Sequence, residues 1–190
     1  MNRIKKKLLI VIAALAAITN LSCNGELTDS AAPVELIATV SQTISQIDLE
    51  SGAGGCTGTI GTINMQVVPK NSTAVGNLVS VRVTRYRVSY RRTDGGTLVP
   101  APFVRSIDTI IGVGQSAALT GFIILEGGAI SQAPFAALLP QNGGRDPETG
   151  RDRVKLEVIV EIFGETLGGD NVFDSTTIPL DFCFDCQGCQ

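Results

Sequence analysis

The stretch Arg153–Phe163, RVKLEVIVEIF, decides the fold class of this chain. Apolar side chains occupy every second position from Val154 to Ile162, and charged side chains such as Lys155 and Glu157 stand between them. A period of two residues is typical of a β-strand with one face in the core and the other in water. The stretch therefore predicts a half-buried strand.

The segment that follows predicts a partner strand. Turn-forming residues fill GETLGGDN, and the stretch 172–184, VFDSTTIPLDFCF, then alternates apolar and polar side chains again. Two alternating stretches around a short turn predict an antiparallel hairpin. Pro179 has no N–H to donate to a ladder, so its strand is expected at a sheet edge or bulged there.

Earlier segments predict more strands, and one predicts an irregularity. The expected strands are 35–49, 59–68, 78–92, 103–111 and 118–125. Within 78–92 the apolar phase shifts by one residue, which predicts a bulge or a crossing between sheets near Thr84–Arg85. A single helical turn is expected at Ser131–Leu139, with Ser131 as its candidate N-cap.

The pattern as a whole favours an all-β fold. About seven to eight strands, abundant glycine and at most one short helix outside the N-terminal segment predict a single antiparallel β-sandwich over residues 34–190. The pattern is similar to that of immunoglobulin-like and fibronectin type III-like modules. The Cys…Trp…Cys hallmark of antibody domains is absent because the chain has no tryptophan.

The N-terminal residues have the features of an export signal. Arg3 and Lys5 to Lys7 form a basic segment, and an apolar run from Leu8 to Ile18 follows it. Crossing a bilayer takes about 20 apolar residues, so this run is too short to span it and has the length of a signal-peptide core. No second long apolar run follows, and no transmembrane helix is expected.

Cys23 comes directly after Leu21 and Ser22. This resembles the lipobox of bacterial lipoproteins, although the family's preferred leucine three residues before the cysteine is replaced by Asn20. The resemblance implies a signal peptide at residues 1–22 and a lipid on Cys23. Residues 23–33 would then form the lipidated cysteine and a short tether. Asn24 in place of aspartate favours the outer membrane of the cell envelope by the same resemblance.

Charge and composition exclude several classes of function. Four of the 15 basic residues and none of the 18 acidic ones lie in residues 1–22, so the remaining side chains carry a formal net charge of −7. An acidic, exported chain is a poor candidate for nucleic-acid binding. The chain also has no histidine, which excludes Ser–His–Asp and Cys–His catalysis and histidine metal ligands. We expect no cofactor and no enzymatic activity.

Four cysteines remain once Cys23 is assigned to the lipid: Cys56, Cys183, Cys186 and Cys189. An even number in an exported chain predicts disulfides. Strand alternation places Cys56 and Cys183 on outer faces, which favours the pairs Cys56–Cys183 and Cys186–Cys189, with Cys56–Cys186 nearly as plausible. The alternative is a thiol-based redox or metal site, because the thiol spacing also suits a four-thiolate centre.

Two further stretches are candidate ligand sites. Arg85, Arg87 and Arg91 share one strand face and could bind phosphate or an acidic glycan, or instead form ion pairs with glutamates such as Glu157 and Glu161. The loop GGRDPETGRDR (143–153) is a weak candidate for calcium, because arginines are interspersed among its acids and the sequence suits a plain turn.

The expected protein is therefore a lipid-anchored component of the bacterial envelope that acts by binding or as a structural module. Its expected partners are the membrane and an envelope protein or glycan. An adhesin or a subunit of a surface assembly is a further alternative, with exposed strand edges as the contacts.

Overall fold

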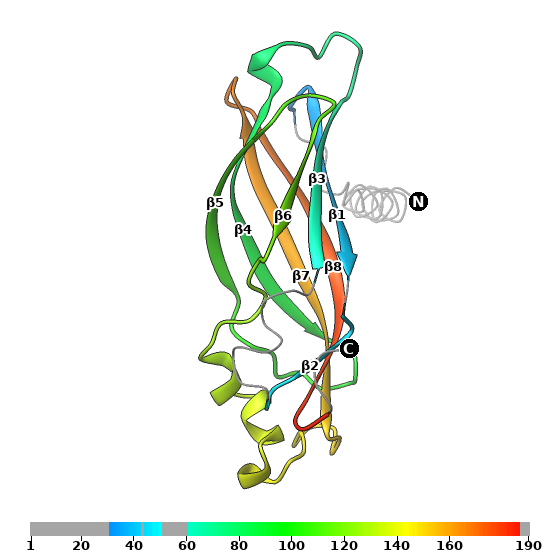
Figure 1. Ribbon diagram of the computed structural model, residues 1–190, viewed down its shortest axis with the longest axis vertical. Coiled ribbons are helices and arrows are strands. Elements are labelled where there is room, and N and C mark those ends of the chain that lie inside the picture. Colours follow the sequence, from blue (N-terminus) through cyan, green and yellow to red (C-terminus); the bar gives the residue numbers. More distant parts are fainter. Residues whose placement is uncertain (1–30, 43, 51–60, 187–190) are drawn as a thin grey trace, which may run out of the picture.

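The computed structural model describes residues 31–42, 44–50 and 61–186, which form two packed β-sheets (Figure 1). The smaller sheet has the order β1-β3-β6, with bounds Val34–Gln42, Gly61–Pro69 and Ser116–Thr120. The larger sheet has the order β2-β8-β7-β4-β5, with bounds Gln46–Asp48, Asn171–Cys183, Arg153–Thr166, Val81–Arg92 and Phe103–Ile111. The predicted all-β sandwich is confirmed.

All strand pairs are antiparallel except β2 with β8, which run parallel. The predicted hairpin is present as β7 and β8, with Leu156 opposite Leu180. Both strands alternate buried and more exposed residues over most of their length, because one face of each lies against the smaller sheet.

The core lies between the two sheets. From β7 it receives Val154, Leu156, Val158, Val160 and Ile162, each at most 1% exposed. The smaller sheet contributes Ile63, Met65 and Val67, likewise at most 1% exposed. These are the faces that the period-two pattern predicts, since burial of apolar area is the main stabilising term.

The irregularity expected near Thr84–Arg85 is a β-bulge in β4. The register of β4 against both neighbours shifts between Val83 and Arg85. Before the shift Val81 and Val83 are buried, and after it Tyr86 and Val88 are. The extra residue therefore keeps apolar side chains on the core face on both sides of the bulge.

Pro179 lies where β8 has no second partner strand. It is opposite Glu157 of β7, and its carbonyl oxygen accepts a hydrogen bond of 2.8 Å from the side-chain amide of Gln42. In a strand the N and O of one residue point to the same side. The missing N–H of proline therefore removes no hydrogen bond to β7, as expected for an edge position.

Three expectations need correction. The segment 35–49 forms two strands in different sheets, β1 and β2, because the chain crosses between the sheets after Gln42. The strand expected at 118–125 is β6 and ends at Thr120, since Gly121 adopts a φ of 62° that extended structure excludes.

The third correction concerns the helical turn expected at Ser131–Leu139. The described residues contain no α-helix and four short 3-10 helices: η2 Asn77–Val79, η3 Ala129–Ser131, η4 Phe135–Leu138 and η5 Pro140–Asn142. Ser131 ends η3 and does not cap η4, whose N-cap is Pro134. The segment closes one end of the sandwich, where the Phe135 ring lies 4.7 Å from the Phe182 ring between centroids.

The two ends of the elongated molecule differ. Residues 31–33 enter β1 at one end, together with the loop after β3 and the β7–β8 turn (Figure 1). Helices η3 to η5, strand β2 and the end of β8 lie at the other end. No helix among the described residues is both long enough and apolar enough to cross a membrane.

Candidate binding site on the outer sheet face

The outer face of the larger sheet carries the arginine row that the sequence singled out, and two of its members form ion pairs. Arg87 Nε lies 2.5 Å from Glu161 Oε2, and Arg91 Nε lies 2.9 Å from Glu157 Oε2. Both pairs join residues that are directly opposite in β4 and β7. The interpretation of these two arginines as partners of Glu157 and Glu161 is confirmed.

Arg85 behaves differently from the other two. Its guanidinium carbon lies 4.9 Å from the centre of the Phe163 ring, an arrangement in which the cation interacts with the aromatic face. Within the described part of the chain, its guanidinium has no carboxylate within salt-bridge distance. Arg85 is also an exposed residue. It therefore presents to solvent a positive charge that no acid in the described ranges neutralises.

Arg85 begins a row of three outward side chains across three strands. It is opposite Phe163 of β7, which is opposite Phe173 of β8. The two phenylalanine rings are stacked, with centroids 6.4 Å apart and an angle of 24° between their planes. Both rings are only partly buried, so an aromatic surface lies next to the free guanidinium.

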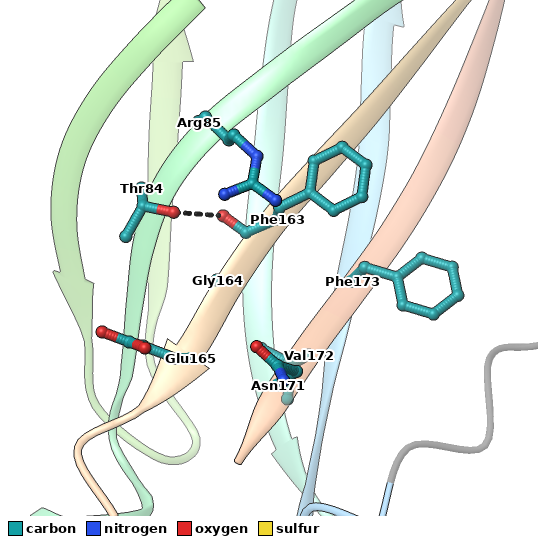
Figure 2. A pocket seen from close by; sticks show the side chains of 8 residues that line it. All are labelled: Thr84, Arg85, Phe163, Gly164, Glu165, Asn171, Val172 and Phe173. Atoms are coloured by element: carbon teal, nitrogen blue, oxygen red, sulfur yellow. Dashed lines mark hydrogen bonds between the residues drawn. The ribbon is translucent and has the colours of Figure 1, made fainter. Parts of the chain in front are cut away.

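A depression of about 460 Å³ lies beside this row (Figure 2). It is lined by Thr84, Arg85, Phe163, Gly164, Glu165, Asn171, Val172 and Phe173. Glu165 and Asn171 are opposite each other in β7 and β8 and form the next outward row. The depression thus combines one cation, two aromatic rings, an amide and one carboxylate.

The bulge places Arg85 on this face. Thr84, the extra residue, directs its hydroxyl to the carbonyl oxygen of Phe163 at 3.4 Å (Figure 2). Gly164 lies under the bulge, where a Cβ would stand 2.8 Å from the Arg82 carbonyl oxygen. Any larger residue would displace the bulged backbone. Bulges often redirect a side chain in this manner beside functional sites.

This arrangement suits recognition of a polar, anionic ring-shaped ligand. The guanidinium offers planar pairs of donors that match a carboxylate. The phenylalanine faces can pack against the apolar face of a sugar ring, and Asn171 and Glu165 can exchange hydrogen bonds with hydroxyls. Sequence reasoning identified Arg85 but missed the two phenylalanines, because their side-by-side position depends on strand register.

The C-terminal cysteines form a different kind of feature from the one expected. Cys183 is bonded to Cys186, with their Cα atoms 6.0 Å apart, so the favoured pairs Cys56–Cys183 and Cys186–Cys189 are wrong, as is Cys56–Cys186. Cys183 is also buried, at 2% exposed, although it lies on the face of β8 opposite to that of Phe182. The chain turns back after β8, so Cys186 reaches Cys183 from the side that alternation would leave in solvent. Cys23, Cys56 and Cys189 lie outside the described residues.

Asp48 at the end of β2 fastens this disulfide-bonded turn. Its carboxylate accepts hydrogen bonds from the backbone N–H groups of Asp185 at 3.1 Å and Cys186 at 3.0 Å. Gln46 donates to the carbonyl oxygen of Cys186 at 2.9 Å. The exposed Glu50 also lies near this turn, and the negative charge of Asp185 raises its pKa. These hydrogen bonds therefore connect β2 to the turn at the end of β8.

A buried charge cluster, missed by sequence reasoning, joins two loops at the same end. Arg92 donates to Asp94 at 2.7 and 2.9 Å and to Asp146 at 2.7 Å. The Arg92 side chain is 2% exposed, and those of Asp94 and Asp146 are 0% exposed. Oxygen Oδ1 of Asp146 is buried without a hydrogen-bond partner among the described residues, so its carboxylate relies on Arg92 and Thr149.

The cluster shifts the titration of its acids. Burial alone would raise the pKa of Asp94, but hydrogen bonds from Arg92 and from the N–H groups of Lys155 and Gly96 outweigh it and lower the pKa to about 2. For Asp146, bonds from Arg92 and Thr149 likewise outweigh burial and lower the pKa. These acids are ionised at neutral pH and form ion pairs with Arg92.

The acidic residues of the loop 143–153, the weak calcium candidate, make structural contacts within the protein. Asp146 bonds to Arg92, and Glu148 accepts hydrogen bonds from the Thr97 side chain and from the N–H groups of Thr97 and Leu98. In the ranges that the structure describes, no group of three or more His, Cys, Asp or Glu side chains has the geometry to hold a metal ion. The loop acts as a brace.

Comparison with known proteins adds no family. No family model matches this chain, and a search of curated proteins finds no match.

Proposed function

We propose that this protein is a non-catalytic binding module held on the bacterial envelope by a lipid on Cys23, and that it binds carboxylate-bearing glycans in the depression beside Arg85. The observation that carries the proposal is the contrast within one strand. Arg87 and Arg91 are paired with glutamates, whereas Arg85 lies on the Phe163 ring and has no carboxylate partner among the described residues.

The energetics favour a ligand with a negative charge and an apolar face. A hydrogen bond to a charged group contributes about 1.5–3 kcal/mol, more than a neutral one. Stacking on Phe163 orients the guanidinium before a ligand arrives, which reduces the entropy lost on binding. The depression is partly open to solvent, so we expect modest affinity that depends on salt.

Glu165 sets a limit on the ligand. Its carboxylate stands in the row beyond Phe163. Glu165 is opposite Asn171 of β8 on one side and opposite Arg82 of β4 on the other. A ligand with several negative charges on one sugar ring would meet this carboxylate and be repelled. A glycan with a single carboxylate per sugar, placed over Arg85, would leave its hydroxyls for Glu165 and Asn171.

The anchoring part of the proposal rests on the sequence. The basic segment, short apolar run and Cys23 resemble a lipoprotein signal, and two or three acyl chains on one cysteine give stable attachment. The sorting resemblance of Asn24 favours the outer membrane. The absence of histidine and the structural use of Cys183 and Cys186 support a non-catalytic role.

Binding can be tested with oligogalacturonate and its methyl ester, which share a backbone and differ in charge. We expect saturable binding of the acid form by isothermal titration calorimetry, weakened by salt, and little binding of the ester. Arg85→Met should weaken binding about tenfold or more, in line with loss of a charge-assisted bond. Arg87→Met is the matched control, and equal loss in both variants would contradict the assigned site.

Attachment is tested separately by the intact mass of the protein purified from bacterial membranes. The expected mass is that of a chain beginning at Cys23 with diacylglycerol and, where added, an amide-linked acyl chain. A chain cut elsewhere and carrying no lipid would contradict the anchoring part and leave the binding part standing.

A further inference from the structure

Val75 and Leu78 are the two most exposed large apolar side chains among the described residues, and the exposed Leu167 lies beside their loop. Val75 is 75% exposed, Leu78 is 70% exposed and Leu167 is 46% exposed. Val75 and Leu78 lie in the loop after β3, and Leu167 begins the β7–β8 turn. We call these three residues the apolar tip. Exposed apolar side chains grouped on neighbouring loops are a candidate contact surface.

The tip is held together by the backbone. The N–H of Leu167 donates to the carbonyl oxygen of Ser80 at 2.8 Å, and the N–H of Gly168 donates to that of Leu78 at 2.8 Å. The two loops, more than 80 residues apart in sequence, therefore form one unit. Helix η2 shapes the first loop but buries none of its three residues.

The chain enters the domain at this same end. Val34 is opposite Pro69, and the N–H of Lys70 donates to the carbonyl oxygen of Pro33 at 3.0 Å. Figure 1 shows the start of β1 at the end that also carries η2 and the β7–β8 turn. Eight residue steps separate Cys23 from Ala31, which at full extension reach at most about 28 Å.

We propose that the apolar tip docks into the interfacial region of the lipid bilayer that holds the Cys23 anchor. This inference rests on the proposed lipid attachment. Two observations select the bilayer as the occupant: the short reach of the tether and its entry beside the tip. Together they keep the tip close to lipid, which raises its effective concentration at the membrane surface.

Neighbouring charges limit the depth of docking. Asp170 lies in the same turn and is exposed, and Glu165 is exposed near the end of β7. Burial of a carboxylate in hydrocarbon is strongly unfavourable, so these groups stay in the hydrated headgroup layer. The docking is therefore shallow and involves the loop side chains alone.

Docking by the tip fixes the orientation of the domain. The long axis of the sandwich stands away from the membrane, and helices η3 to η5 lie at the far end (Figure 1). The depression beside Arg85 lies on the side of the molecule, on the outer face of the larger sheet. Its Glu165 and Asn171 end lies next to the headgroup layer, whereas its Arg85 end faces ligands while the tip is in lipid.

The test uses tryptophan fluorescence, because the chain has no natural tryptophan. Leu78→Trp places the probe in the tip, and Gln141→Trp places it at an exposed position of η5 at the opposite end. Each full-length lipidated variant is reconstituted into vesicles of phosphatidylethanolamine and phosphatidylglycerol with brominated acyl chains. Circular dichroism checks that each variant keeps the fold.

We expect Leu78→Trp to lose most of its emission to bromine and Gln141→Trp to keep it. Vesicle flotation measures attachment of the protein to the vesicles through its anchor, independently of quenching. Flotation of both variants without quenching of either would overturn the docking and leave the anchor intact. Equal quenching of both would overturn the orientation. Failure to float would contradict the anchor and the docking that rests on it.

Discussion

Arg92 and Asp94 form a doubly hydrogen-bonded ion pair inside the protein, with donor–acceptor distances of 2.7 and 2.9 Å. The neighbouring Arg91 also pairs with an acid, but its side chain is 67% exposed, whereas that of Arg92 is 2% exposed. These two adjacent arginines differ in how much their ion pairs should matter, because removal of one partner leaves an uncompensated charge only where the pair is buried.

The first prediction compares these arginines. Arg92→Met should lower the free energy of unfolding by about 3–5 kcal/mol, since it leaves Asp94 and Asp146 buried without their counterion. Arg91→Met, in an exposed pair, should change it by about 0–1 kcal/mol. Urea unfolding followed by circular dichroism measures both. Similar losses in the two variants would show that the buried Arg92 cluster stabilises the fold no more than the exposed Arg91 pair does.

The second prediction concerns acid. The pKa of Asp94 is lowered from 3.8 to about 2, and the pKa values of Asp146 and Glu148 are also lowered. A lowered pKa in the folded state contributes stability that is present above the unfolded pKa and lost as the pH falls through the folded one. Stability should therefore decline steeply from about pH 4 towards pH 2.

The Asp94→Asn variant separates this cluster from the other carboxylates. It lacks the carboxylate whose pKa is lowered to about 2, so its urea midpoint should fall less between the same two pH values. Asp108→Asn is the control, because Asp108 pairs with Arg82 at an exposed position. A pH dependence unchanged by Asp94→Asn would contradict the assignment.

The third prediction is the disulfide pairing. Cleavage before aspartate, without reductant, releases a peptide from Asp181 to Phe184 and another that begins at Asp185. Because Cys183 is bonded to Cys186, these peptides should remain linked in the mass spectrum. They should remain linked in Cys189→Ser as well. Separation of the peptides in that variant would show that Cys183 pairs elsewhere.

The fourth prediction tests the bulge. A Cβ at Gly164 would stand 2.8 Å from the Arg82 carbonyl oxygen and 3.0 Å from a methyl group of Val81. Gly164→Ala should therefore cost about 1–3 kcal/mol of stability and weaken ligand binding at Arg85, because the bulged backbone must move. Gly127→Ala has open space and should do neither. Unchanged binding by Gly164→Ala would contradict the claim that the bulge positions Arg85 for ligand binding.

The period-two pattern predicted the strands well because the core lies on one face of each sheet. It placed Val154 to Ile162 in the core and located the bulge at Thr84–Arg85. It failed for Cys183, where the chain turns back after β8 and covers a face that alternation assigns to solvent.

The candidate site was less accessible to sequence reasoning. Arg85 could be named, but its difference from Arg87 and Arg91 depends on which side chain of β7 lies opposite. Phe163 is opposite Arg85, whereas glutamates are opposite the other two. Strand register sets these neighbours, and a one-residue bulge moves them all. The Arg92 cluster was missed because it joins the end of β4 to Asp146, which lies in a loop 54 residues further along the chain.

The central claim is that Arg85 is the ligand-binding arginine of this sheet face. Nuclear magnetic resonance of the arginine Nε–H groups, during titration with oligogalacturonate, tests it most directly. We predict a saturable shift of the Arg85 signal, with the signals of Arg87 and Arg91 nearly unchanged because glutamates already hold them. A constant Arg85 signal, or equal shifts of all three arginines, would contradict the claim.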